Sequence, residues 1–324
     1  MAAQPRPAPR YESAETDGAF ARDVIGGLTG RPKRLSPKYF YDKIGAKLFE
    51  QITALPEYYP TRCELAILCD NAAAIAQFIP SGAALVEFGS GSSKKARCLI
   101  ATAAKISAYV PVDISSEMLS EEARGLRRDY PNLKVMPVEA DFTQPFRLPA
   151  ALADVPRVGF FPGSTIGNFE PHEACSFLRH ARRILDPHAT LIIGVDLVKD
   201  KNILNAAYDD ATGITAKFNL NLLTRINREL GANFDLTTFS HEAFYNSERH
   251  RIEMHLASKK RQKVRVAGRV IDFRAGETIH TENSYKYTLE SFGALARGAG
   301  WTPAAVWTDA NGYFSVQALV AQDE

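Results

Sequence analysis

The chain has 324 residues, of which 45% are hydrophobic and 23% charged, so it is long enough to bury the core of one large domain or two smaller ones. Its 39 basic and 37 acidic residues give a formal net charge of +2, which excludes a global electrostatic field that attracts nucleic acid. No run of about 18 apolar residues occurs, and the N-terminus lacks the apolar region of a signal peptide. We therefore expect a cytoplasmic protein without a membrane partner.

The first part of the chain predicts an arm followed by helices. Residues 1–17 are rich in proline and alanine without periodicity, which is typical of a disordered arm, and residues 19–27 have the pattern of a short helix. Apolar residues recur at helical spacing after Asp42 and predict an amphipathic helix that ends at Pro56.

Two adjacent tyrosines follow this helix. Tyr58 and Tyr59 lie between Pro56 and Pro60, and because proline fixes its own φ angle, we expect their rings to be held in place. Thr61 is predicted to cap the next helix, which runs towards residue 78.

The middle of the chain alternates strand-like and helical segments. This alternation predicts an α/β fold with a doubly wound, Rossmann-like parallel sheet and helices on both faces. Ligands of such sheets bind outside the carboxyl ends of the strands. The expected strands are 83–88, 107–112, 133–138, 157–161 and 190–196, and the expected helices are 94–104, 115–129 and 171–186.

The alternation breaks after Asp196. Residues 202–230 are expected to be largely helical, and 233–236 and 244–246 to be loop-like and aromatic. Alternating strands are expected over 251–257 and 264–273. The α/β pattern then resumes with a helix over 289–298 and strands over 303–308 and 313–321. Asn311-Gly312 between these two strands is a strong hairpin signal. We therefore predict that residues 201–286 are an insertion into the α/β domain and not a separate C-terminal domain.

The cysteines and histidines do not predict a metal site. The four cysteines form no Cys-x-x-Cys pair and have no histidine at metal-ligand spacing, which indicates scattered thiols in a reducing compartment. His250 and His255 flank an apolar strand and lack a carboxylate–histidine arrangement. The cysteines are Cys63, Cys69, Cys98 and Cys175.

Three expected strand ends carry residues that suit an adenosine ligand. Gly89-Ser90-Gly91 provides a turn that a ligand can approach closely, and Asp113 is placed to accept both hydroxyls of a ribose. Asp141-Phe142 suits the amino group and the face of adenine. The third glycine of the dinucleotide fingerprint is missing, which favours S-adenosylmethionine over a dinucleotide. The alternative is that Asp113 caps a helix and that Phe142 belongs to the core.

A shaped loop follows the fourth expected strand. Residues 161–169 contain two glycines and a proline and lead to a helix with Pro171 in its first turn. Asn168 in this loop offers one acceptor group and two donors to a polar ligand, or caps its own turn.

Several longer motifs resemble those of the histidine Nα-methyltransferases of ergothioneine biosynthesis, within the class I S-adenosylmethionine-dependent methyltransferases. The resemblance implies three successive methyl transfers to the α-amine of L-histidine, giving hercynine. It also implies that 61–200 with 287–324 binds the cofactor, and that 18–60 with 201–286 binds the substrate. The motifs are Tyr41-Asp42, 55–62, 88–91, 162–169, Tyr208-Asp209-Asp210, 251–256 and 282–287.

The resemblance also assigns residues. Cofactor contacts are expected at Gly89, Lys95, Asp113, Asp141 and Phe142, and substrate contacts at Tyr58, Asn168, Tyr208, Glu282 and Ser284, with Tyr41 and Met254 nearby. Asn168 and Tyr208 are the expected catalytic residues, and Tyr59 is the alternative to Tyr58.

The chemistry of methyl transfer fits these assignments. The reaction is an in-line displacement, so alignment of amine and methyl is the main task. Glu282 with Ser284 can hydrogen-bond an imidazole, whereas an apolar residue in place of Glu282 would favour indole. The alternatives are an α-N-methyltransferase for tryptophan or another aromatic amino acid, an NAD-dependent oxidoreductase, and a non-catalytic adenosine-binding module. We expect a monomer without metal or nucleic acid.

Overall fold

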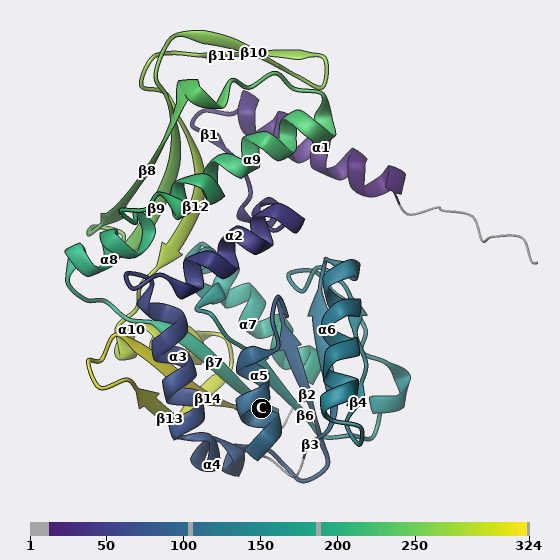
Figure 1. The fold of residues 1–324 in the computed structure, drawn as a ribbon. Helices are drawn as coiled ribbons and strands as arrows, with labels where there is room; N and C mark the ends of the chain where they lie inside the picture. Colours follow the sequence, from purple (N-terminus) through teal and green to yellow (C-terminus); the bar gives the residue numbers. More distant parts are fainter. Residues whose placement is uncertain (1–12, 103–105, 186–188, 323–324) are drawn as a thin grey trace, which may run out of the picture. The chain divides into compact units, whose positions relative to one another are not determined.

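The central sheet forms where the sequence alternates apolar strands with amphipathic helices. In the computed structural model, which describes residues 13–102, 106–185 and 189–322, the eight-stranded sheet has the order β13-β14-β7-β6-β2-β3-β4, with β5 also paired to β3 (Figure 1). β2, β3, β6 and β7 pair in parallel, whereas β14 is antiparallel to β7 and β13. The predicted parallel sheet and final hairpin are confirmed. The strands are β2 (Ala83–Phe88), β3 (Ile106–Asp113), β4 (Lys134–Val135), β5 (Val138–Glu139), β6 (Arg157–Phe161), β7 (Thr190–Asp196), β13 (Trp301–Thr308) and β14 (Phe314–Ala321).

Helices cover both faces of this sheet because side chains alternate along each strand. Leu85 and Phe160 pack in one apolar cluster with α3, α4, α5 and α6, whereas Val86 and Phe161 pack in a second cluster with α7 and α10. Every residue of β2 is buried, as expected for a strand covered on both faces. The helices are α3 (Tyr59–Asp70), α4 (Ala72–Ile75), α5 (Lys94–Thr102), α6 (Ser116–Asp129), α7 (Pro171–Leu185) and α10 (Leu289–Gly298).

The described residues pack as two units. Unit 1 comprises 13–51, 209–243 and 253–282, and unit 2 comprises 52–208, 244–252 and 283–322 and contains the eight-stranded sheet. The predicted limits of a cofactor domain and a substrate domain stay a prediction.

A four-stranded sheet has the order β1-β12-β9-β8, and β10 and β11 form a separate hairpin. Asp42 accepts a hydrogen bond from the N–H of Gly45 at 2.8 Å and pairs with Arg228 at 2.7 Å, so it begins α2 as predicted and ties α2 to α9. The remaining elements are α1 (Ser13–Thr29), β1 (Lys33–Arg34), α2 (Lys43–Ala54), α8 (Lys201–Tyr208), α9 (Ile214–Leu230), β8 (Phe239–Asn246), β9 (Arg251–Ser258), β10 (Gln262–Val266), β11 (Arg269–Phe273) and β12 (Thr278–Tyr285), with short 3-10 helices at η1 (Pro37–Phe40), η2 (Ala76–Phe78), η3 (Ala150–Leu152), η4 (Thr165–Asn168) and η5 (Leu236–Thr238).

Two predicted boundaries near the N-terminus were wrong. Residues 13–17, assigned to the disordered arm, lie in α1, because no proline interrupts the chain between residues 13 and 29; residues 1–12 of the arm lie outside the described residues. α3 begins at Tyr59 instead of after Thr61, because proline is tolerated in the first turn of a helix and Pro60 lies there.

Two strand predictions also need correction. The strand expected over 133–138 is split into β4 and β5, because Pro137 cannot donate to the ladder. Residues 244–246, expected to be loop-like, are the end of β8 (239–246), since pairing with β9 stabilises a strand whose polar residues gave no clear apolar alternation.

The prediction of scattered thiols was wrong for one pair. Cys69 in α3 and Cys98 in α5 are joined in a disulfide, and their Cα atoms are 5.4 Å apart. The two positions are 29 residues apart in sequence, so only the packing of α3 beside α5 brings them together. Cys63 and Cys175 are free.

Candidate active site

The loop after β2 brings together two residues predicted to contact a cofactor. Gly89 has a φ of +74°, a conformation that glycine adopts without steric strain. Its N–H donates to the carbonyl of Val112 at 2.8 Å, which ties the loop to the end of β3. A Cβ atom on Gly89 would lie 3.2 Å from Cε1 of Phe142. The structure therefore places Gly89 and Phe142 side by side at the carboxyl edge of the sheet.

The two predicted carboxylates lie at the ends of neighbouring strands. Asp113 ends β3, and its carbonyl accepts from the N–H of Ala140, one residue before Asp141. The Asp113 carboxylate accepts from the N–H of Ser115 at 2.9 Å, and burial raises its pKa against the lowering effect of backbone hydrogen bonds. The Asp141 carboxylate accepts from the N–H of Thr143 at 2.9 Å. Ser115, and not Asp113, is the N-cap residue of α6, so the Asp113 carboxylate orders the turn before the helix without capping it. Its contact with a cofactor stays a prediction.

Lys95 lies in the first turn of α5 and forms a buried ion pair. Its Nζ is 2.5 Å from Oε2 of Glu64, a carboxylate with 1% side-chain exposure. Glu64 also accepts from the N–H of Gly163 at 2.8 and 2.9 Å. Sequence reasoning missed Glu64, which links α3 to α5 and to the loop after β6.

The loop after β6 packs against the last residues of β7 and β12. Ser164 has a φ of +53°, and its hydroxyl accepts from the N–H of Asp196 at 2.9 Å. A Cβ atom on Gly167 would lie 2.8 Å from the carbonyl oxygen of Tyr285, so only glycine permits this close approach. Asn168 ends η4 in this loop and is half-buried.

Three of the predicted substrate residues are neighbours in unit 2. The hydroxyls of Tyr208 and Ser284 are 2.8 Å apart, although the residues are 76 positions apart in sequence. The rings of Tyr58 and Tyr208 meet edge to face with centroids 6.2 Å apart. The adjacent Tyr59 instead donates its hydroxyl to Asp196 at 2.8 Å.

A buried ionic network lies directly against these hydroxyls, and sequence reasoning assigned it no role. Lys286 donates to Asp196 at 2.6 Å, and Lys199 contacts the other oxygen of the same carboxylate at 2.6 Å. Burial alone would raise the pKa of Asp196, but the two ammonium groups hold it below its usual value. The signal for Lys286 was available, because Glu282, Ser284 and Lys286 follow one another at the two-residue spacing of a strand face.

Three further predicted substrate residues, Met254, Glu282 and Tyr41, belong to unit 1. Met254 is buried in β9, and its carbonyl accepts from the hydroxyl of Thr281 at 3.0 Å. Glu282 is half-buried in β12. Tyr41 is 37% exposed and packs edge to face on Phe49 and Phe218.

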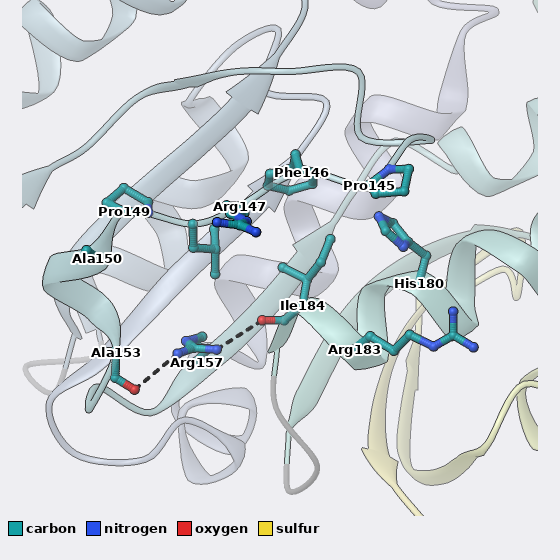
Figure 2. Close-up of a pocket in the computed structure, with 11 residues that line it drawn as sticks. Pro145, Phe146, Arg147, Pro149, Ala150, Ala153, Arg157, His180, Arg183 and Ile184 are labelled. Carbon is teal, nitrogen blue, oxygen red and sulfur yellow. Dashed lines mark hydrogen bonds between the residues drawn. The ribbon is translucent and has the colours of Figure 1, made fainter.

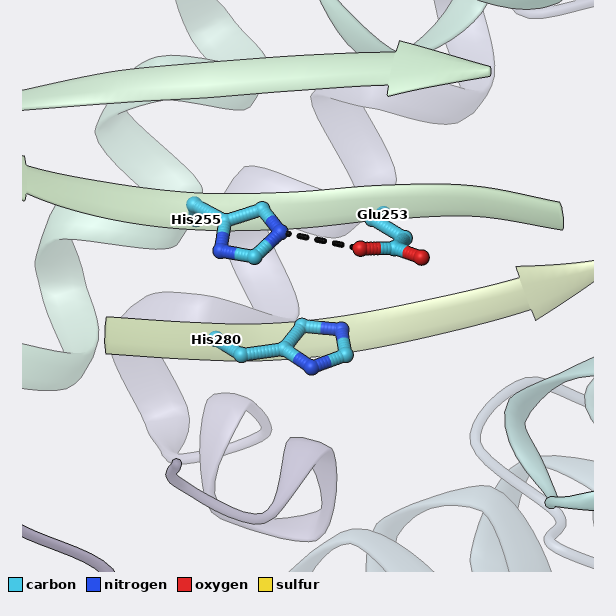
Figure 3. Close-up of side chains that lie close together, drawn as sticks. All are labelled: Glu253, His255 and His280. Carbon is cyan, nitrogen blue, oxygen red and sulfur yellow. Dashed lines mark hydrogen bonds and ion pairs between the residues drawn. The ribbon is translucent and has the colours of Figure 1, made fainter. Parts of the chain in front are cut away.

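A histidine–carboxylate cluster in unit 1 corrects one premise of the sequence analysis. Figure 3 shows His255 next to Glu253 on β9, with His255 Nε2 3.3 Å from Glu253 Oε2. The ring of His280 on β12 stacks on His255 with centroids 4.6 Å apart. His255 therefore does have a carboxylate neighbour, because residues two apart in a strand share a face. The three side chains each offer an atom within 4.8 Å of the others, a spacing that fits a metal ion. The expectation that the protein needs no metal stays a prediction.

A pocket of about 530 Å³ in unit 2 contains none of the predicted site residues. Its Arg157 donates to the backbone carbonyls of Ala153 and Ile184, so this guanidinium serves the fold (Figure 2). The pocket is lined by Pro145, Phe146, Arg147, Leu148, Pro149, Ala150, Ala153, Arg157, His180, Arg183 and Ile184.

The sheet order and the loops at its carboxyl edge define the class of protein. A parallel sheet with Gly-x-Gly after β2, an acidic residue at the end of β3 and the antiparallel β14 between β7 and β13 is the class I S-adenosylmethionine-dependent methyltransferase fold. The chain belongs to the family described as histidine-specific, SAM-dependent methyltransferases, whose model matches residues 20–321.

Named relatives support this membership. The chain is 42% identical over 307 residues to a histidine N-alpha-methyltransferase of Mycobacterium tuberculosis, covering 92% of this chain and 94% of the relative. It is 43% identical over 312 residues to the protein of the same name from Mycolicibacterium smegmatis, covering 93% and 95%. It is 31% identical to ergothioneine biosynthesis protein 1 of Neurospora crassa, over 87% of this chain and 32% of that protein.

Proposed function

We propose that this enzyme transfers methyl groups from S-adenosylmethionine to the α-amine of L-histidine, and that three transfers give hercynine for ergothioneine biosynthesis. The observation that carries the proposal is the similarity, over more than nine tenths of the chain, to two proteins named histidine N-alpha-methyltransferase. The similarity to an ergothioneine biosynthesis protein supports the proposal that the methylated product is used in ergothioneine biosynthesis.

The residues at the carboxyl edge of the sheet fit the cofactor. When bound, S-adenosylmethionine supplies an electrophilic methyl group on a sulfonium, so no covalent nucleophile is needed. Gly89 lets the Phe142 ring pack directly against the loop after β2, and an aromatic ring at this place suits contact with an aromatic base. The half-buried carboxylates of Asp113 and Asp141 suit the hydroxyl and amino donors of an adenosine. Lys95 completes the predicted contacts from the first turn of α5.

The tyrosines and Asn168 hold the amino acid. Tyr58 and Tyr208 are each 8% exposed, and their rings provide a dry surface for the α-amine. A free α-amino group titrates near pH ~8, and desolvation of the ammonium favours the neutral amine that attacks the methyl group. Asn168 and Tyr208 orient the amine and the carboxylate of the substrate. The contact of Tyr59 with Asp196 supports Tyr58, and not Tyr59, as the substrate residue.

Glu282 and Ser284 recognise the imidazole. They are two residues apart in β12, so their side chains project from the same face of the strand. A carboxylate that accepts from a ring N–H makes a charge-assisted hydrogen bond. Indole has no second ring nitrogen, so it would leave one of the two groups without its partner. The resemblance adds Tyr41 and Met254, which belong to unit 1 like Glu282, to the expected substrate contacts.

The proposal is tested by mass spectrometry of the purified protein with S-adenosylmethionine and each standard amino acid in turn. A gain of three methyl groups on histidine alone is expected. Methylation of tryptophan or tyrosine would keep the reaction class and overturn the assigned substrate, and a protein that binds the cofactor and methylates nothing would overturn the activity.

Substitution of Glu282 by alanine tests the recognition of the imidazole. A hydrogen bond to a charged group contributes about 1.5–3 kcal/mol, so Glu282→Ala should lower kcat/KM for histidine roughly 10- to 150-fold, with the cofactor Kd within about threefold of wild type. Glu242→Ala, at an exposed glutamate of β8, is the matched control. Unchanged histidine kinetics in Glu282→Ala would refute the role.

The expected monomer and cytoplasmic location are part of the proposal. Among the described residues, no helix is both long and apolar enough to cross a lipid bilayer. Light scattering of the purified protein measures the oligomeric state directly.

A further inference from the structure

We propose that Lys286 is a positioning residue that turns the hydroxyls of Tyr208 and Ser284 into a fixed hydrogen-bond donor for the substrate. The inference rests on the proposed function and adds a residue that the resemblance did not assign. The Lys286 side chain is fully buried. Its Nζ lies 2.6 Å from Asp196 Oδ2, 2.8 Å from Ser284 Oγ and 3.1 Å from the Tyr208 hydroxyl.

The hydrogen bonds of Lys286, Tyr208 and Ser284 direct one hydroxyl proton outward, whichever of the two hydroxyls donates to the other. A lysine ammonium has three donors and no acceptor, and all three donors are used here. Tyr208 and Ser284 must therefore both accept from Lys286. Their oxygens are 2.8 Å apart, so one hydroxyl donates its proton to the other. The hydroxyl that accepts twice has filled both lone pairs, and its own proton is directed to a group outside the trio. The trio thus directs one O–H donor outward, and the hydroxyl that donates within the pair keeps one lone pair.

The direction of this proton determines which substrate group the outward hydroxyl can contact. A hydroxyl that can only donate fits an acceptor, such as an unprotonated imidazole nitrogen or a carboxylate oxygen. It does not fit an imidazolium or an ammonium, which have only donors to offer. If Ser284 carries the outward proton, the substrate imidazole is held as the neutral tautomer whose other nitrogen donates to Glu282.

The surrounding charges keep Lys286 protonated, so Lys286 always donates hydrogen bonds to Tyr208 and Ser284. Burial alone would lower the pKa of Lys286, but attraction to Asp196 and the hydrogen bonds raise it above its usual value. Asp196 has two further partners, since Lys199 Nζ lies 2.6 Å from Oδ1 and the Tyr59 hydroxyl donates to Oδ2 at 2.8 Å. Removal of Lys286 therefore leaves the buried carboxylate paired.

The chain offers a matched control for the test. Lys286 and Lys199 each bind Asp196 at 2.6 Å, and their side chains are 0% and 4% exposed. The hydrogen bonds of Lys199 go to Asp196, Tyr59 and the carbonyl of Leu197, and not to Tyr208 or Ser284. Lys286→Met and Lys199→Met thus remove the same charge from the same carboxylate, and only the first releases the two hydroxyls.

The experiment compares KM for the amino acid, kcat and cofactor Kd in the two variants. Lys286→Met should raise the histidine KM about 5- to 30-fold, which corresponds to one hydrogen bond of about 1–2 kcal/mol, with the cofactor Kd within threefold. Lys199→Met should lower the melting temperature by about as much as Lys286→Met does, but its histidine KM should stay within threefold of wild type. Equal KM values in the two variants would assign Lys286 a structural role only and overturn the proposal.

A double-mutant cycle tests whether Lys286 acts through Ser284. In a Ser284→Ala background, Lys286→Met should raise KM less than half as much as in wild type, because the hydroxyl that it orients is already absent. The same factor in both backgrounds contradicts the inference. If Lys286→Met does not fold, Lys286→Arg retains a charge for Asp196 without three donors on one nitrogen, and it too should raise KM.

The activity of the wild-type protein shows which of the two proposals is wrong. If wild type methylates a different amino acid, the assigned substrate is wrong, and the KM comparison is made with that amino acid instead. A wild-type protein that methylates no amino acid overturns both proposals.

Discussion

The burial of Glu87 predicts that the free energy of unfolding of this protein falls as the pH rises from mildly acidic to mildly alkaline. Glu87 lies in β2, two residues before Gly89, and is 1% exposed. It accepts hydrogen bonds from the hydroxyls of Tyr109 and Ser90. Burial raises its pKa from 4.5 to about 8, although the hydrogen bond from Tyr109 and the charge of Lys95 lower it.

The sign and the size of the effect follow from this pKa. Between pH 4.5 and about 8 the folded state keeps a proton that the unfolded chain has lost. The contribution of Glu87 to stability is therefore complete below pH 4.5 and is lost as the pH rises through about 8. At 1.36 kcal/mol per pH unit, the whole change is on the order of 5 kcal/mol.

Glu87→Gln removes the titration and retains an oxygen that accepts from Tyr109. The free energy of unfolding of this variant, relative to wild type, should rise by several kcal/mol between pH 5 and pH 8.5. Urea unfolding followed by tryptophan fluorescence is a suitable assay, because Trp301 is fully buried and both tryptophans, Trp301 and Trp307, lie in unit 2 with Glu87.

Glu121→Gln makes the same amino-acid substitution at an exposed position of α6 and serves as the control. It should give a pH dependence parallel to that of wild type. If the curve of Glu87→Gln is also parallel to that of wild type, then burial does not hold Glu87 protonated and the reasoning is refuted.

Two further substitutions test the cofactor site and the fold. Asp113→Ala should raise the cofactor Kd roughly 10- to 100-fold in calorimetry, since it removes hydrogen bonds to a charged acceptor, and a wild-type Kd would remove Asp113 from the ribose site. Thr288→Ala should lower stability by about 1 kcal/mol in urea unfolding, because Thr288 and Ser291 form a capping box at the start of α10, and an unchanged midpoint would show that the box contributes nothing.

The sequence by itself predicted the features that depend on neighbouring residues. The alternation of apolar and amphipathic segments predicted the succession of strands and helices along the chain. β2, β6, β7 and α10 have the predicted limits. The final hairpin was predicted from Asn311-Gly312, and Gly312 has a φ of +66°. These features are local because backbone conformation and side-chain period are properties of short segments.

The tertiary structure decided which distant side chains meet. Lys286 and Asp196 are 90 positions apart and are brought together where Leu197 pairs with Tyr287 beside β7. Similarly, Glu64 reaches Gly163 across 99 positions. Strand pairing between remote segments sets these contacts, and no periodicity within one segment encodes its partner. β8 was missed for the same reason, since its strand conformation depends on pairing with β9. The residue types of the candidate site were therefore readable from the sequence, whereas the buried charge network behind Tyr208 and Ser284 was visible only once the chain had folded.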